Sequence, residues 1–502
     1  MSLSSKDTLR LDQLRRAAKT LKKSYDAGDA GAVQVVQNLW GKSPGTHADF
    51  LHVIARQHGF MSWPRLKWAA ETIGLERAEA QEQLKMALFN GNRAAAEALL
   101  AATPDLAAGN MGLLCATFDL EGLTAALCED PARAIEPVGP RRPILHLAFS
   151  KWGRMGGEEA ASLACAEVLL AHGADVNDAF PHSPGTDEML SALYGALGHA
   201  RNLPLAEWLL EWGADPNDGE SLYHATELGD AAGVRLLLRY GANPQGTNAL
   251  LRAMDFDNAE MVALLLGAGA DPNESAQPGY NALHHAALRG AGREVSEFVL
   301  NAGASVTSEH AALKPHAFAR LVGAEAVRAV LETVDAPRDV PADLAPLVNG
   351  GGEGFVDPAK IPAELQGLLT ELVHRVGTLK RIKSLVEVGF PWDAPDSMGV
   401  TPVQASGWVG LPEYLRYFLK LGPDLSHLND FGGSLLGTIL HGSENAPERS
   451  GQDHLACLEI VLTHGVALPR RALSAQLRPD VAEFLRKWAK AHPGQVVEHG
   501  VY

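Results

Sequence analysis

The chain has 502 residues, of which 46% are hydrophobic and 21% charged, and its formal net charge is −17. This composition is ordinary for a protein with a buried core, and no apolar run approaches the ~20 residues that cross a bilayer. The four cysteines form no CxxC pair, which favours buried thiols over disulfides or metal ligands. Because the start of the chain is charged and lacks the apolar core of a secretion signal, we expect a cytoplasmic protein without a membrane partner.

Residues 1–75 combine a helical pattern with a basic composition. The first 70 residues hold eleven lysines and arginines against five aspartates, a net charge of +6, which leaves −23 for the rest of the chain. Arg15, Lys19 and Lys22 share one stripe of the first helix. We interpret this unit as a helical cap, with contact of its basic helix to nucleic acid as the alternative. The acidic remainder argues against nucleic acid as a partner of the whole protein.

Residues 80–334 carry a repeated helix ending. Residues 80–135 read as two helix pairs without a clean closing turn. Further on, "CAEVLLAHGADVN", "LAEWLLEWGADPN", "GVRLLLRYGANPQ" and "EMVALLLGAGADPN" each end an apolar helix at a glycine and leave through a polar turn. Glycine suits this place because it adopts the left-handed conformation that closes a helix. The closing glycines, spaced 40, 28, 28 and 34 residues apart, are Gly173, Gly213, Gly241, Gly269 and Gly303.

A second motif keeps a similar step ahead of each glycine: "PILHLA", "SALYGA", "ESLYHA", "NALLRA" and "NALHHAA". Together the two motifs resemble the ankyrin repeat, whose consensus opens with TPLHxA and closes with LLxxGADxN, most clearly over residues 140–307. The resemblance implies an all-α solenoid of helix-turn-helix units, which stack because one helix pair cannot cover its own apolar face. It also implies that His284, at the consensus histidine, bonds the backbone of adjoining loops.

Downstream of the clear repeats the pattern weakens. Residues 335–364, dense in proline and glycine, are predicted to be a loop or linker. Their "NGGGEG" lacks the Gly-Lys-Ser/Thr of a phosphate-binding loop and follows no strand. Residues 365–470 read as divergent ankyrin repeats, in which Gly389 and Gly422 take the closing position. Residues 471–502 are predicted to form a C-terminal helical cap and tail.

The sequence carries no motif for catalysis or for metal binding. It has no GxSxG, no HExxH and no Cys/His set with finger spacing, and we expect its nineteen histidines to be structural or solvated. We therefore predict a non-enzymatic protein with no catalytic residue, no cofactor and no metal. A cryptic enzyme that uses the insertions at residues 151–160, 178–190 and 335–364 is the remaining alternative.

Protein binding is the function that the resemblance implies. Ankyrin-family arrays bind partners through the concave helix face and the loop tips, and tryptophan and tyrosine are enriched in interface hot spots. Trp152, Tyr223 and Trp408 are accordingly predicted to face a protein partner. The stretch "ARQHGFMSWPRLK", residues 55–67, also resembles a segment found ahead of ankyrin repeats in bacterial proteins, which implies a cap more than an activity.

Overall fold

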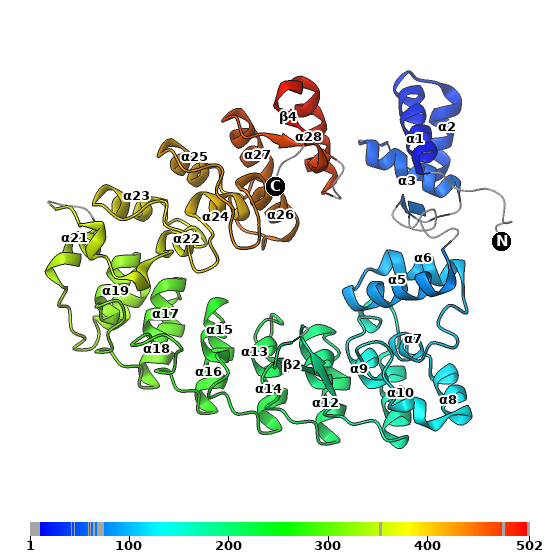
Figure 1. Cartoon of the computed structure of the whole chain (residues 1–502), viewed down its shortest axis with the longest axis horizontal. Helices are drawn as coiled ribbons and strands as arrows, with labels where there is room; N and C mark the ends of the chain where they lie inside the picture. Colours follow the sequence, from blue (N-terminus) through cyan, green and yellow to red (C-terminus); the bar gives the residue numbers. More distant parts are fainter. Residues whose placement is uncertain are drawn as a thin grey trace. The chain divides into compact units, whose positions relative to one another are not determined.

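The computed structural model is built from short helices arranged in pairs, which confirms the predicted all-α repeat architecture (Figure 1). The chain divides into two compact units, unit 1 (residues 1–243) and unit 2 (residues 244–502), which we describe in turn. Within the part of the chain that the structure describes, no helix is both long enough and apolar enough to cross a membrane. The structure describes residues 11–41, 43–44, 46–58, 60, 62–63, 66–67, 75–183, 185–350, 354–473 and 477–498.

Unit 1 begins with three helices around a small core. Leu14, Val36 and Phe50, one from each helix, belong to one buried cluster, because each helix has a single apolar stripe. Arg15 and Lys19 of the first helix are exposed. The three helices are α1 (Leu11–Asp26), α2 (Ala30–Trp40) and α3 (His47–Gln57).

Helix pairs fill the rest of unit 1. Several second helices begin at an asparagine or aspartate whose side chain accepts a hydrogen bond from an otherwise unpaired amide; Asn92, Asp119 and Asn202 each do so. The insertion at residues 178–190 forms a hairpin in which Phe180 lies opposite Leu190. The elements are α5 (Arg77–Asn90), α6 (Arg93–Ala102), α7 (Met111–Ala116), α8 (Leu120–Glu129), α9 (Pro143–Ala148), α10 (Glu159–Ala171), β1 (Ala179–Pro181), β2 (Met189–Ser191), α11 (Ala192–Tyr194), α12 (Leu203–Glu211), α13 (Ser221–Ala225) and α14 (Ala232–Arg239).

Unit 2 continues the same plan to the end of the chain. A parallel bridge between β3 (Leu468–Pro469) and β4 (Val496–Val497) ties the last helix down. The helices are α15 (Ala249–Asp255), α16 (Ala259–Gly267), α17 (Ala282–Arg289), α18 (Arg293–Asn301), α19 (Pro315–Val322), α20 (Glu325–Leu331), α21 (Ala345–Asn349), α22 (Leu368–Val373), α23 (Leu379–Glu387), α24 (Pro402–Val409), α25 (Pro412–Lys420), α26 (Leu435–Asn445), α27 (His454–Thr463) and α28 (Pro479–Ala491).

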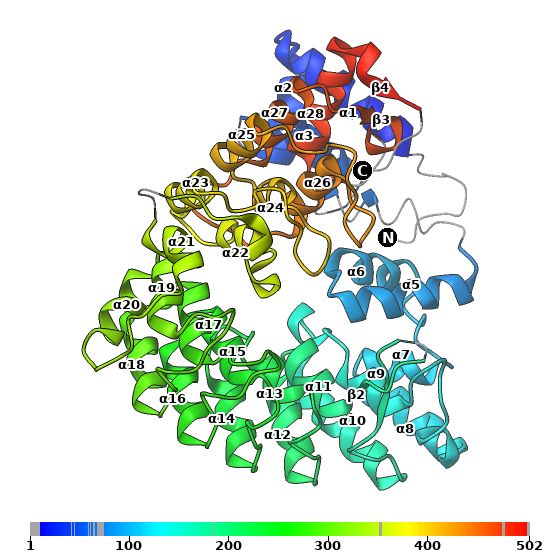
Figure 2. The same ribbon diagram turned by 60° about the vertical axis from the view of Figure 1, so that its left-hand side comes forward.

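Stacking of neighbouring pairs produces one continuous core within unit 2. First helices pack on first helices (α15 on α17, α17 on α19) and second helices on second helices (α16 on α18, α18 on α20), as both ribbon views show (Figure 1 and Figure 2). Leu250, Leu283 and Val262 are buried between the layers. Each pair thus shelters the apolar face of the next.

Residues 335–350 and 354–364, from the segment predicted to be a loop or linker, include a short α-helix. The helix α21 buries Leu347 and Val348 and packs against α19. Further along, Val356 donates its amide to the carbonyl of Val388 at 2.8 Å. The described part of this segment thus contacts the repeats on both sides, through α21 and through Val356.

Two features read from the sequence fall partly outside the described residues. Residues 351–353 of the "NGGGEG" stretch do so, as do Gly59 and Pro64 of the motif at residues 55–67. For the N-terminal unit, the structure therefore describes mainly α1 to α3. For residues 335–364, it describes α21 and the residues after 353.

Candidate partner-binding surface

The loop tips are positioned by glycine-ended turns. Gly269 has φ 96° and no heavy atom within reach of an added Cβ, so the backbone conformation alone requires glycine there. At Gly389, with φ 104°, a Cβ would also lie 2.6 Å from the Val356 carbonyl oxygen. The same left-handed turn, with φ between 80° and 94°, occurs at Gly173, Gly213, Gly241, Gly303 and Gly422.

The asparagine of the closing motif links each turn to the next. The side-chain amide of Asn273 donates to the Gly303 carbonyl at 3.0 Å, and its oxygen accepts from the Ser305 amide at 2.7 Å. Asn177 makes the matching pair of bonds in unit 1, to the Gly213 carbonyl and the Asp215 amide. These bonds fix the spacing of successive loop tips, because the backbone of each tip is hydrogen-bonded to the asparagine side chain of the preceding tip.

His284 joins two repeats from inside the core. It is fully buried; its Nδ1 lies 2.9 Å from Asn281 Oδ1 and its Nε2 lies 3.1 Å from the Leu313 carbonyl oxygen. Burial lowers the pKa of the imidazole to about 4, although the bond to Leu313 opposes this. A neutral ring at physiological pH therefore bridges α17 and the next turn.

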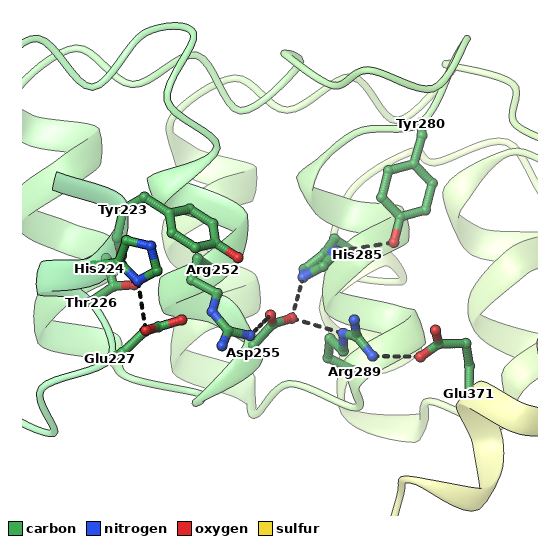
Figure 3. Close-up of polar contacts among 10 residues, drawn as sticks. All are labelled: Tyr223, His224, Thr226, Glu227, Arg252, Asp255, Tyr280, His285, Arg289 and Glu371. Carbon is green, nitrogen blue, oxygen red and sulfur yellow. Dashed lines mark hydrogen bonds and ion pairs between the residues drawn. The ribbon is translucent and has the colours of Figure 1, made fainter. Parts of the chain in front are cut away.

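A polar network lies on the first helices of unit 2 and centres on Asp255 (Figure 3). The Tyr280 hydroxyl donates to His285 Nδ1 at 3.0 Å, and His285 Nε2 lies 2.8 Å from Asp255 Oδ1. Arg289 donates to the same oxygen at 2.8 Å. Arg252 donates to the second oxygen, also at 2.8 Å. Three side chains from two helices thus converge on one carboxylate.

The network fixes the charges of its members. Burial would raise the pKa of the Asp255 carboxyl, but the hydrogen bond from His285 and the charge of Arg289 outweigh it and lower the pKa to about 2. Burial would lower the pKa of Arg289, but the charges of Glu371 and Asp255 raise it. Burial raises the pKa of the Tyr280 hydroxyl. Asp255 is therefore an anion and Arg289 a cation over the whole physiological pH range.

The divergent repeats attach to this network through α22. Glu371 of α22 accepts from Arg289 at 2.6 Å, as Figure 3 shows. Arg375, just after α22, donates to the carbonyls of Ala287 and Val322 at 3.2 and 3.0 Å. These charge-assisted bonds join the end of α22 to the C-terminal turns of α17 and α19.

A cavity of about 400 Å³ opens beside the network, within unit 2. Its floor includes the buried residues Tyr280, His310 and Phe318, and its rim includes the exposed residues Glu364 and Ser397. Most of the lining comes from residues 277–280, 363–371 and 395–397, and Leu288, His310 and Phe318 complete it. A volume of this size is in the range of small ligand sites.

Two successive loop tips of the divergent repeats expose large apolar side chains. Phe431 is 73% exposed and Met398 45% exposed. Each lies two residues after a turn residue, Asn429 or Asp396, whose side-chain oxygen accepts amides of its own tip. The two tips are adjacent, because the amide of Asp430 donates to the Met398 carbonyl at 3.1 Å.

The three predicted contact residues are half-buried and engaged inside the protein. The Trp152 ring lies against the backbone at Gly157, where an added Cβ would be 2.3 Å from the indole. Tyr223 packs edge-on against His224, with the ring centroids 5.0 Å apart. Trp408 contacts the His441 ring with centroids 5.0 Å apart. Trp152 and Tyr223 belong to unit 1 and Trp408 to unit 2.

Unit 1 has a smaller polar group around His224. Its Nδ1 lies 2.8 Å from Glu227 and its Nε2 3.3 Å from Glu220. The Thr226 hydroxyl donates to the Tyr223 carbonyl at 2.7 Å. These bonds stabilise the C-terminal end of α13.

Neither the exposed tip residues nor the Asp255 network was identified from the sequence. Phe431 lies in "NDFGG" and Met398 in "DSMGV". Aligning these two stretches, which directly precede Ser434 and Thr401, would have placed both side chains at the tip of a turn. Asp255 and Glu371 are 116 residues apart in the chain, so no local pattern links them. In the described part of the chain, no group of three or more His, Cys, Asp or Glu residues is placed to hold a metal ion.

Comparison with known proteins supports the repeat assignment. A family model of ankyrin repeats matches residues 193–276 and 222–310. The chain contains ankyrin repeats. The ankyrin repeat domain of human ASB11 is 20% identical, covering 47% of this chain and 96% of its own, with a TM-score of 0.22. That of Bcl-3, a member of the IkappaB family, is 18% identical, covering 43% of this chain and 92% of its own, with a TM-score of 0.21. A search of curated proteins finds no match.

Proposed function

We propose that the protein is a non-enzymatic cytoplasmic binding module that recognises a protein partner through the loop tips and first-helix face of its ankyrin repeats. Ankyrin repeats are generally protein–protein interaction modules. One observation carries the proposal for this chain: Met398, Leu428 and Phe431 expose large apolar side chains on adjacent tips, at 45%, 44% and 73%. Grouped apolar side chains of this kind mark interaction sites on protein surfaces. Trp152, Tyr223 and Trp408 remain secondary contacts in the proposal.

The test is site-directed photo-crosslinking of the intact protein in its native cells. A photoreactive phenylalanine analogue replaces Phe431 at the tip in one variant. In the control variant it replaces Phe256, which is 50% exposed and lies in the turn between α15 and α16. We expect a discrete protein adduct from position 431 and none from position 256. Equal adducts from both positions, or none from 431, would contradict the proposed surface.

A second variant tests the energy of the same contact. Phe431→Ser combined with Met398→Ser is expected to weaken capture of the crosslinked partner at least tenfold, since each exposed hot-spot side chain contributes more than about 1 kcal/mol. Folding should be unchanged, because both side chains are exposed. The alanine variants of Trp152, Tyr223 and Trp408 then show whether those residues add to the contact.

A further inference from the structure

The cavity beside the Asp255 network has the chemistry of a cation site. Among the residues that the structure describes, its lining includes the acidic residues Glu364, Glu371 and Asp396 and neither lysine nor arginine. Glu371 is paired with Arg289 at 2.6 Å. Glu364 and Asp396 form no ion pair with any residue that the structure describes. The cavity is therefore lined by two acidic residues that form no ion pair within the described part of the chain.

Aromatic rings form the floor of the same cavity. The Tyr280 and His310 rings meet edge to face, with centroids 4.9 Å apart at 76°, and His310 meets Phe318 at 6.0 Å and 66°. Tyr280 is held in place by the hydroxyl bond to His285, and His310 by a 3.3 Å contact of Nδ1 with the Pro278 carbonyl. Aromatic faces attract cations, most strongly where water is excluded.

We propose that this cavity accepts a lysine or arginine side chain of the protein partner, which places its charged head between Glu364 and Asp396. The proposal rests on the proposed function and names the chemistry of the partner. The apolar walls, Leu288, Leu365 and Leu368, suit the methylene stem of such a side chain, because long basic residues bury their stems and present their charge to polar groups.

The surrounding loop tips favour the same kind of partner. Residues 391–400 and 422–433 contain four aspartates and neither lysine nor arginine. Asp396 and Ser397 line the cavity, and Met398 follows them on the same tip. A partner segment that covers Met398 and Phe431 with apolar residues can thus place its next residue in the cavity. Charge complementarity selects a basic, apolar segment over an acidic one.

The test uses the full-length protein and a fluorescein-labelled nine-residue peptide with a central arginine flanked by leucine and phenylalanine. Its matched control replaces the arginine with citrulline, which keeps the shape and removes the charge. By fluorescence anisotropy, we expect the arginine peptide to bind at least tenfold more tightly than the citrulline peptide. Equal affinity for the two, or no binding of the arginine peptide up to millimolar protein, would overturn the proposal.

Two double variants locate the charge. Glu364→Gln with Asp396→Asn removes both carboxylates, while the new amide oxygen can still accept from the amides of Met398 and Val400 as Asp396 does. Asp393→Asn with Asp424→Asn changes the net charge equally on exposed residues that do not line the cavity. We expect the first variant to lose the arginine preference and the second to keep it within twofold, with both showing wild-type thermal unfolding. Equal losses in both variants would overturn the cavity as the site.

Two further outcomes separate this inference from the proposed function. Arginine amide as a free competitor should be at least tenfold weaker than the peptide; equal potency would identify a small-molecule site and overturn a partner side chain. If the cavity variant abolishes the arginine preference while crosslinking from position 431 continues, both ideas stand. If crosslinking persists and the cavity variant has no effect on peptide binding, only the cavity proposal fails.

Discussion

Unit 2 contains a regular and a divergent version of the same repeat. In the regular version, His284 of α17 bonds the carbonyl of Leu313. In the divergent version, Gln404 takes the matching place in α24 and donates to the carbonyl of Gly433 at 3.0 Å. Leu313 and Gly433 occupy equivalent positions, one residue before the next repeat opens. The comparison shows that both versions of the repeat keep a hydrogen bond from the first helix to the carbonyl that precedes the next repeat. The side chain that donates this bond differs, histidine in one version and glutamine in the other.

The two versions also differ in how closely their first helices approach. Counted from Asn281 and Thr401, Ala287 of α17 corresponds to Gly407 of α24. A Cβ on Gly407 would lie 2.7 Å from Ile439 of α26. In the divergent version the side chain of Ile439 therefore packs directly on the backbone of Gly407, where the regular helix carries the methyl group of Ala287.

The largest expected effect comes from Gly442→Ala. The new Cβ in α26 would lie 2.1 Å from the Trp408 carbonyl oxygen, a backbone atom that cannot move aside. We expect a loss of about 3 kcal/mol or more in the free energy of unfolding, measured by urea titration, because overpacking forces the helices apart. Gly267→Ala in α16, where an added Cβ meets nothing within 4 Å, is the control and should be neutral or stabilising.

Next in size is Arg381→Ala, which removes a link between the divergent and regular repeats. Arg381 donates to the carbonyls of Leu321 at 2.7 Å and Leu347 at 2.5 Å. Two buried carbonyls would lose a charged donor, at a cost of about 2–4 kcal/mol. Urea unfolding and amide exchange of α19 and α21 measure the effect. Arg293→Ala breaks only an exposed pair with Glu297, so a loss as small as that of this variant would contradict the assigned role.

Asp255→Asn tests the network by its pH dependence. The folded pKa of about 2 lies below the ordinary value of about 4, so the carboxylate stabilises the fold above pH 4, and this contribution is lost as the pH falls through 2. It amounts to about 2 kcal/mol at pH 7. The difference in unfolding free energy between wild type and variant should shrink by roughly half at pH 3. A difference that does not change with pH would argue against an ion network.

The smallest effect is expected from His284→Gln. This substitution gives the regular repeat the residue that the divergent repeat has at the matching place, Gln404. At pH 7 the free energy of unfolding should change by less than about 1 kcal/mol, because glutamine can keep the bond to Leu313. Wild-type His284 stays neutral when folded, with a pKa of about 4, while the unfolded ring takes up a proton near pH 6.5. Stability should therefore fall from pH 6.5 towards pH 4 in the wild type and fall less in the variant. Parallel pH curves would refute this.

Sequence patterns predicted the parts of the fold that depend on single residues. A glycine at the end of an apolar helix signals a left-handed turn, so Gly269 could be read directly. His284 followed from the family resemblance, since its partners lie in adjoining turns. These features are local or repeat at a fixed step, and for that reason the repeats were readable.

The candidate surface could not be predicted in the same way. Trp408, for example, packs against the ring of His441 in another helix, which residue type does not reveal. The cavity requires residues 363–371 to reach the turn at residues 277–280, a meeting set by Arg289, Glu371 and Arg375 across more than 80 positions. Only the tertiary structure shows which carboxylates gather there.

The arginine links have a consequence for synthesis on the ribosome. The carbonyl of Leu321 receives its donor from Arg381, sixty positions later. At about 5–20 residues per second, the nascent chain waits roughly 3–12 s between making the acceptor and making the donor. During that interval only water can bond the Leu321 carbonyl at the end of α19. A chain released before residue 381 would therefore lack the arginine donor of this carbonyl.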